Sequence, residues 1–66
     1  MQVTVNGRAS EHPDGTTLPG LVAHYGLTVG AVVVEHNGTA LLRGELERTP
    51  LRDGDRVELV RAVAGG

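Results

Sequence analysis

Polar and apolar residues alternate along parts of the chain with the period of two that is typical of strands. Residues 2–5 alternate in this way, and so do residues 56–60 near the end of the chain. Residues 31–35 are instead rich in β-branched valine, which favours extended backbone. We expect a strand in each of these stretches.

An Asn-Gly pair follows two of the stretches, at residues 6–7 and 37–38. Asparagine and glycine both tolerate positive φ, so this pair is the strongest short signal for a two-residue hairpin turn. Each turn predicts a second strand that returns beside the first. We place these strands at residues 8–12 and near residues 40–42.

Between the hairpins, the apolar residues change to helical spacing. Thr16 or Thr17 is suited to cap the start of the helix, Pro19 is tolerated in its first turn, and Gly26 is suited to end it in a left-handed conformation. One face of this helix should be apolar, because residues at positions i, i+3, i+4 and i+7 are Leu18, Leu21, Val22 and Tyr25.

The predicted elements form an α+β domain in the order ββαβββ. Residues 43–49 are polar and irregular, so we expect coil or a single helical turn there, and residues 50–55 have the composition of a turn. With 66 residues, the chain has room for one domain. Folding a chain of this size buries only about 60% of its unfolded surface, so a deep catalytic cleft is not expected.

Composition narrows the classes of function. The net charge is −2 and the charges are interspersed, so nucleic acid is not an expected partner. No apolar run approaches the length of a membrane span, and the N-terminus lacks the layout of a signal peptide. The chain has no cysteine, which excludes disulfides and thiolate metal sites and favours a reduced, cytoplasmic setting.

Candidate metal ligands are scattered. His12, His24 and His36 lie in different predicted elements, without the short spacing of a metal site. Asp53 and Asp55 flank a glycine as in a calcium loop, but the glutamate that such a loop needs at its twelfth position is missing. We interpret the aspartates as part of a turn and expect no bound metal.

Candidate catalytic sets are equally weak. Ser10 precedes His12 by two residues and Asp14 follows, but a catalytic triad depends on spatial geometry and on a cleft. Glu45 and Glu47 are paired carboxylates without a predicted pocket. We therefore expect that the chain is not an enzyme.

The C-terminal segment has no structural role in this scheme. Gly65 and Gly66 offer no side chain to pack and cost conformational entropy. We therefore divide the chain into a folded domain at residues 1–63 and a flexible tail at residues 64–66. If the last strand ends near residue 60, the residues beyond it reach about 20 Å when extended, which is long enough to enter the interior of a partner.

The order of elements and the diglycine ending together resemble the ThiS family, bacterial sulfur carriers of thiazole formation in thiamine biosynthesis with a ubiquitin-like β-grasp fold. Terminal glycines alone are weak evidence, but combined with the upstream Asp-Gly-Asp turn they are specific. Residues 41–43 depart from the family, because Leu-Leu-Arg stands where Val-Pro-Arg is common. The matching segments cover nearly the whole chain: residues 5–7, 15–18, 34–38, 51–58 and 63–66.

The resemblance implies a mixed five-stranded sheet with the first and last strands adjacent and parallel, and one helix packed across one face. The parity of the strand residues agrees with this arrangement. The residues that would face the helix are Val3, Val5, Val32, Val34, Val57 and Leu59.

The resemblance also implies a chemistry for the tail. An E1-like adenylyltransferase would use ATP and Mg²⁺ to adenylate Gly66, and a persulfide donor such as a cysteine desulfurase would supply sulfur. The resulting thiocarboxylate would donate sulfur to thiazole synthase. Ala64 and Gly65 would thread into the active sites of these partners, and the chain itself would bind no cofactor.

Val33 and Val60 have the parity that points away from the predicted core, and we expect them to form part of an apolar docking surface for partners. Other interpretations stay open at this point. The chain could carry sulfur for molybdopterin or amino-acid biosynthesis, be conjugated to proteins as a ubiquitin-like tag, or be a non-covalent β-grasp interaction module whose Gly-Gly end is frayed.

Overall fold

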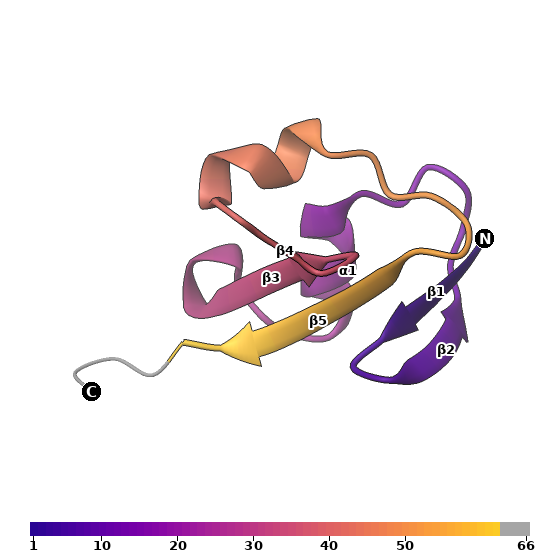
Figure 1. The fold of residues 1–66 in the computed structure, drawn as a ribbon, viewed down its shortest axis with the longest axis horizontal. Helices are drawn as coiled ribbons and strands as arrows, with labels where there is room; N and C mark the ends of the chain where they lie inside the picture. The colour runs from indigo at the N-terminus through magenta and orange to yellow at the C-terminus, as the bar shows by residue number, and fades with distance from the viewer. Residues whose placement is uncertain (63–66) are drawn as a thin grey trace.

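The computed structural model describes residues 1–62 and shows a five-stranded mixed sheet with one α-helix across one face (Figure 1). The strand order is β2-β1-β5-β3-β4, with β5 parallel to β1 and antiparallel to β3. This arrangement confirms the predicted α+β class, the ββαβββ order and the β-grasp fold. The elements are β1 (Gln2–Val5), β2 (Arg8–Glu11), α1 (Leu18–His24), the 3₁₀ helix η1 (Val29–Ala31), β3 (Val32–His36), β4 (Thr39–Leu41), the 3₁₀ helix η2 (Arg43–Arg48) and β5 (Arg56–Arg61).

Both hairpin turns form where the Asn-Gly pairs predicted them. Asn6 and Asn37 have φ of 49°, and the glycines that follow have φ of 83° at Gly7 and 86° at Gly38. Positive φ at both central residues is the requirement of a type I′ turn, whose twist matches that of the paired strands. These turns set the registers of β1 with β2 and of β3 with β4.

The helix begins and ends at the predicted signals. Thr17 is the N-cap, and its Oγ1 accepts a hydrogen bond of 3.1 Å from the N–H of Gly20. Gly26, at φ of 72°, follows the last turn, and the N–H groups of Gly26 and Leu27 donate to the carbonyls of Ala23 and Val22. Within residues 1–62, no helix is long and apolar enough to cross a bilayer.

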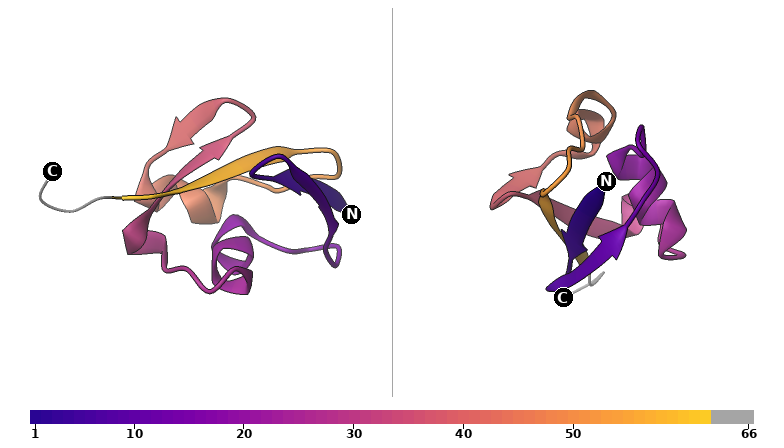
Figure 2. Two further views of the ribbon diagram at one scale, coloured as in Figure 1. Left: turned by 90° about the horizontal axis from the view of Figure 1, so that it is seen from below. Right: turned by 90° about the vertical axis from the view of Figure 1, so that its right-hand side faces the viewer.

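The core lies between the sheet and the two helical segments, α1 and η2 (Figure 2). The predicted parity is confirmed for the buried strand residues, while Val32 is half-buried at the edge of the core. Tyr25 differs from the prediction, because it is the helix C-cap and is 41% exposed. The buried hydrophobic residues are Val3, Val5, Leu18, Leu21, Val22, Val34, Leu46, Val57 and Leu59.

The segment expected to be coil or a single helical turn is the 3₁₀ helix η2, and it contributes to the core. Glu45 holds its first turn, because its Oε1 accepts a hydrogen bond of 2.7 Å from the N–H of Leu42. Leu46 is 2% exposed and packs beneath the sheet with the residues of α1. Burial of this single leucine explains why a polar segment adopts a defined conformation.

Asparagine side chains from both turns hold β5 in the sheet. The Asn6 carboxamide accepts from the N–H of Leu59 at 2.8 Å and donates to the carbonyl of Leu59 at 3.3 Å. The Asn37 carboxamide accepts from the N–H of Arg56 at 2.8 Å. Each side chain therefore adds backbone-like hydrogen bonds to β5 beyond those of the strands themselves.

Asp55 fixes the chain just before β5. Its Oδ2 lies 2.7 Å from His36 Nε2 and accepts from the N–H of Arg52 at 2.9 Å, and its Oδ1 accepts from Asn37 Nδ2 at 3.1 Å. Burial alone would raise the pKa of the Asp55 carboxyl, but the hydrogen bonds from His36, Arg52 and Asn37 outweigh burial and lower this pKa below its ordinary value. The ionised carboxylate is thus the form that the fold stabilises.

Leu46→Ala should destabilise the domain by about 3 kcal/mol, because it removes a fully buried side chain and leaves a cavity. Leu42→Ala is the matched control, because Leu42 is 74% exposed and its truncation should change stability by less than about 0.5 kcal/mol. Denaturant unfolding of both variants tests this. If Leu46→Ala lowered the free energy of unfolding as little as Leu42→Ala does, η2 would not contribute to the core.

Asp55→Asn should lower stability by about 2 kcal/mol at neutral pH, since a charge-assisted network is replaced by neutral hydrogen bonds. The folded pKa of Asp55 lies below the ordinary value of 3.8, so its stabilisation is fully present above about pH 4 and is lost as the pH falls through the folded pKa. Thermal melts from pH 7 to pH 2 should therefore fall less steeply for the variant than for the parent. A parallel decline in both proteins would contradict this role.

Candidate functional site

The predicted site residues Ala64, Gly65 and Gly66, and the predicted domain boundary at residue 63, lie outside the residues that the structure describes. The described chain leads up to them through β5, the central strand, which runs toward the end of the molecule opposite Met1 (Figure 1). One residue beyond β5, the N–H of Ala62 donates to the carbonyl of Ala31 at 2.9 Å. We call this point, where Ala62 is anchored, the root of the C-terminal segment.

The sheet face away from α1 carries exposed aliphatic side chains near this root. Val33 and Val60 are paired across β3 and β5 and are 43% and 48% exposed. The prediction that both point away from the core is confirmed, while their role in docking stays a prediction. Leu42 is 74% exposed and follows Leu41, the partner of Val34. Continued by one residue, the same register places Leu42 beside Val33.

We call Leu42, Val33 and Val60 the aliphatic row. These three are among only four large hydrophobic residues that are exposed within residues 1–62. Leu42 is a surface residue that was not predicted from the sequence. The signal was present, because the register set by the two-residue turn at residues 37–38 ends with Leu41 opposite Val34, and Leu42 is the next residue and has the opposite parity.

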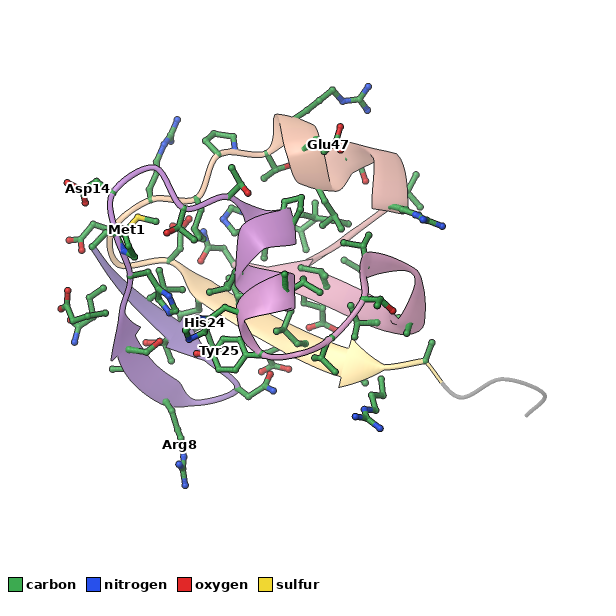
Figure 3. The ribbon with its side chains drawn as sticks, turned by 180° about the vertical axis from the view of Figure 1, so that it is seen from behind. Met1, Arg8, Asp14, His24, Tyr25 and Glu47 are labelled. Atoms are coloured by element: carbon green, nitrogen blue, oxygen red, sulfur yellow. The ribbon has the colours of Figure 1, made fainter. Side chains whose placement is uncertain are left out.

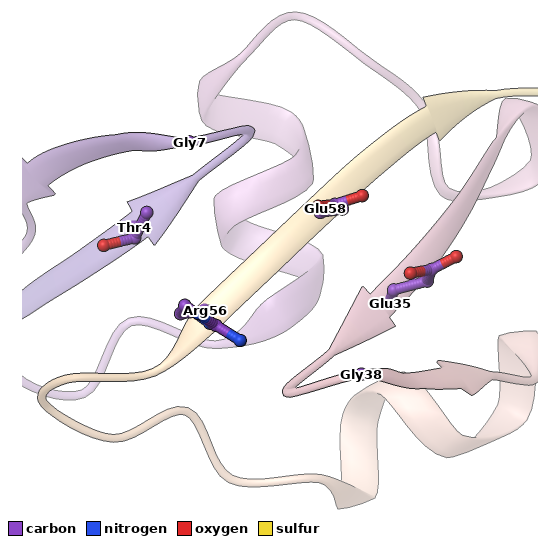
Figure 4. A pocket seen from close by; sticks show the side chains of 6 residues that line it. All are labelled: Thr4, Gly7, Glu35, Gly38, Arg56 and Glu58. Atoms are coloured by element: carbon purple, nitrogen blue, oxygen red, sulfur yellow. The ribbon is translucent and has the colours of Figure 1, made fainter.

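An acidic pair lies next to the aliphatic row on the same face. Glu35 and Glu58 are Cα partners across β3 and β5. Each is two residues from Val33 or Val60 on its own strand and therefore lies on the same face of the sheet. Both line an open hollow of about 450 Å³, where their carboxylates project on the side of the sheet opposite α1 (Figure 4). The full lining is Thr4, Gly7, Glu35, Gly38, Arg56 and Glu58.

The candidate Ser-His-Asp set does not assemble. Ser10 Oγ lies 2.8 Å from His12 Nε2, but Asp14 instead accepts from the N-terminal amine of Met1 at 3.2 Å. Ser10 Oγ also contacts the carbonyl of Val3 at 3.2 Å and the hydroxyl of Tyr25 at 3.3 Å. A carbonyl only accepts, so all contacts are satisfied when Ser10 donates to Val3 and accepts from the other two groups. His12 then acts as a donor to Ser10 and not as its base.

The histidines are less scattered than expected. The rings of His12 and His24 meet edge to face with centroids 5.1 Å apart, and the ring of Tyr25 packs against His24 at 5.0 Å (Figure 3). His36 lies elsewhere, paired with Asp55. In the described part of the chain, no group of three or more His, Cys, Asp or Glu residues is arranged to hold a metal ion.

The remaining candidate carboxylates have structural partners or solvent around them. Asp53 accepts a hydrogen bond of 2.6 Å from the N–H of Gln2, so the segment of Asp53 and Asp55 is the predicted turn. Glu45 caps η2, and Glu47 is exposed on the same element (Figure 3). Neither Glu45 nor Glu47 lines the hollow.

Comparisons with known proteins agree with this architecture. The model of the ThiS family matches residues 2–66. A thiazole synthase of Magnetococcus marinus is 33% identical over the whole of this chain, which spans 20% of the length of that protein. A crystal structure of the thiamine biosynthesis protein ThiS from Geobacter metallireducens superposes with a TM-score of 0.83 at 32% identity, with all of both chains covered. A solution structure of a thiamine biosynthesis protein from the same organism gives 0.79 at 32% identity, covering all of this chain and 88% of that one. The chain belongs to the ThiS family.

Proposed function

We propose that this protein is the sulfur carrier of thiazole formation in thiamine biosynthesis and that the carboxylate of Gly66 is its reacting group. The observation that carries the proposal is membership of the ThiS family across residues 2–66, a span that includes both terminal glycines. The position of β5 supports it, since the central strand leads directly to these residues. The folded domain then serves as the part that partner enzymes bind, and no catalytic group is assigned to it.

The carboxylate must be activated by another protein. A C-terminal carboxyl has a pKa near 3.3 to 3.7, so at neutral pH it is an anion with little electrophilic character. Adenylation by an E1-like adenylyltransferase, with the ATP and Mg²⁺ bound by that enzyme, gives a mixed anhydride. A persulfide sulfur attacks the carbonyl carbon and expels AMP, which gives an acyl disulfide with the donor. A thiol then attacks the donor's sulfur, forms a disulfide with it and releases the thiocarboxylate.

Glycine suits both positions of this tail. Gly66 presents an unhindered carbonyl to the incoming sulfur, and Gly65 and Ala64 fit a narrow channel because they carry little or no side chain. The domain binds the enzyme at a surface distant from the reacting atoms. This binding positions the carboxylate, so the reaction becomes effectively unimolecular. Because the first step consumes ATP, we also propose that the protein acts in the cytoplasm.

The partners follow from the same chemistry. Thiazole synthase is the sulfur acceptor in this proposal, supported by the relative of that name in which a segment similar to the whole of this chain is part of a longer protein. A shared polypeptide would keep carrier and acceptor at high effective concentration. The adenylyltransferase and a persulfide donor such as a cysteine desulfurase complete the cycle.

Incubation with the cognate adenylyltransferase, ATP, Mg²⁺ and a persulfide donor should raise the intact mass by about 16 Da, because sulfur replaces oxygen. Deletion of Gly66 and the substitution Gly65→Val should abolish this shift. Neither change should alter the melting temperature by more than a surface substitution does, because the buried hydrophobic residues of the described chain lie between Val3 and Leu59.

Normal charging of both tail variants, or an unchanged mass of the parent with an active enzyme, would refute the proposal. A covalent Gly66 adduct with other proteins would instead identify a ubiquitin-like tag. Sulfur transfer to molybdopterin or amino-acid precursors, and not to thiazole, would identify another pathway.

Val60→Asp should weaken adenylyltransferase binding by about tenfold while leaving thermal stability nearly intact, because Val60 is 48% exposed on the aliphatic row. Ala23→Asp, at an exposed position of α1, is the charge-matched control and should bind normally. Titration calorimetry measures both affinities. A large loss of stability in Val60→Asp would mean that the side chain belongs to the core.

A further inference from the structure

We propose that Glu35 and Glu58 form an acidic half-site that receives a lysine or arginine side chain of thiazole synthase, next to an apolar side chain that covers the aliphatic row. This inference rests on the proposed function and adds to it the chemistry of the partner surface. It is drawn from the geometry of the open sheet face (Figure 4).

The reach of the tail limits where an enzyme can dock. Gly66, the reacting residue of the proposed function, is four residues from Ala62 in the sequence, a separation of about 13 Å at most when extended. An enzyme whose active site receives Gly66 must therefore contact the surface around the root. On the face away from α1, the part of that surface nearest the root is the aliphatic row, and the acidic pair lies next to it, two residues further from the root on each strand.

The acidic pair is unfavourable for the isolated domain. Like charges directly opposite each other on neighbouring strands destabilise a sheet. The ion pairs of residues 1–62 involve Met1 and His36 and leave Glu35 and Glu58 without a cationic partner within 4 Å. A cation from another protein would turn this repulsion into attraction, and partial exclusion of water at an interface would strengthen it.

The register defines the spacing of the complementary groups. Val60 and Glu58 are two residues apart on β5, as are Val33 and Glu35 on β3, so the Cα atoms of each pair are about 7 Å apart along the strand. The partner should present an apolar side chain and a lysine or arginine at this spacing. Arg56 lines the same hollow two residues from Glu58 on β5, on the side opposite Val60, and repels a second cation there, which gives the pairing a single orientation.

We assign the acidic pair to thiazole synthase because, of the enzymes in the proposal, it is the one supported by a relative that includes a segment like this chain. The aliphatic row is common to every enzyme that receives the tail. The acidic pair then lets this protein distinguish thiazole synthase from the adenylyltransferase, because only thiazole synthase makes an electrostatic contact with it.

The double variant Glu35→Gln and Glu58→Gln tests the inference on the full chain. Its affinity for thiazole synthase, measured by titration calorimetry at low salt, should fall by about tenfold, and the salt dependence of the affinity should become shallower. Glu58→Gln alone should show an intermediate loss. The melting temperature should stay the same or rise, because a like-charge pair is removed.

Glu47→Gln is the control for net charge, because Glu47 is exposed on η2 and does not line the hollow. It should bind thiazole synthase like the parent. The adenylyltransferase should bind the double variant within about twofold of the parent, and the variant should still gain the mass of a thiocarboxylate. If the double variant forms the thiocarboxylate normally, its loss of affinity for thiazole synthase tests the acidic pair alone and not the carrier function.

Three results would overturn the inference. Unchanged affinity of the double variant for thiazole synthase would show that no cation meets the acidic pair. An equal loss in Glu47→Gln would reduce the effect to net charge. An equal or larger loss of adenylyltransferase binding would assign the acidic pair to the activating enzyme and not to the sulfur acceptor.

Discussion

The hydrogen bonds between two asparagine side chains and β5 are the interaction on which the rest of the structure depends. Asn6 pairs with the backbone of Leu59, and Asn37 pairs with that of Arg56. Together with the backbone pairing to β1 and β3, these contacts hold β5 in one register. Because side chains alternate along a strand, the same register places Val57 and Leu59 in the core and turns Glu58 and Val60 outward. The register of β5 therefore determines both the composition of the core and that of the proposed binding surface.

Much of the fold could be predicted because its signals are local. The Asn-Gly pairs demand positive φ at adjacent residues, which few other sequences accept. Thr17 and Gly26 mark the helix ends through contacts with residues at most four positions away. The parity of the strand residues predicts that Val33 and Val60 point outward, since alternation is a property of the strand itself.

The features that escaped prediction arise from contacts between distant parts of the chain. Asn6 and Leu59 are 53 residues apart, so no local pattern shows that a turn residue also holds the last strand. The burial of Leu46 depends on where η2 meets α1. The opposition of Glu35 and Glu58 requires the antiparallel register of β3 with β5, which the sequence does not encode in any short segment.

The central position of β5 also determines how the domain responds to mechanical force. A force applied to the chain beyond Ala62 would act along the axis of β5. The hydrogen bonds to β1 and β3 lie across that axis on both sides of the strand, so the pull loads them together in shear and does not peel them apart one at a time. A pull on this end of the domain therefore does not separate β5 from its neighbours one hydrogen bond at a time.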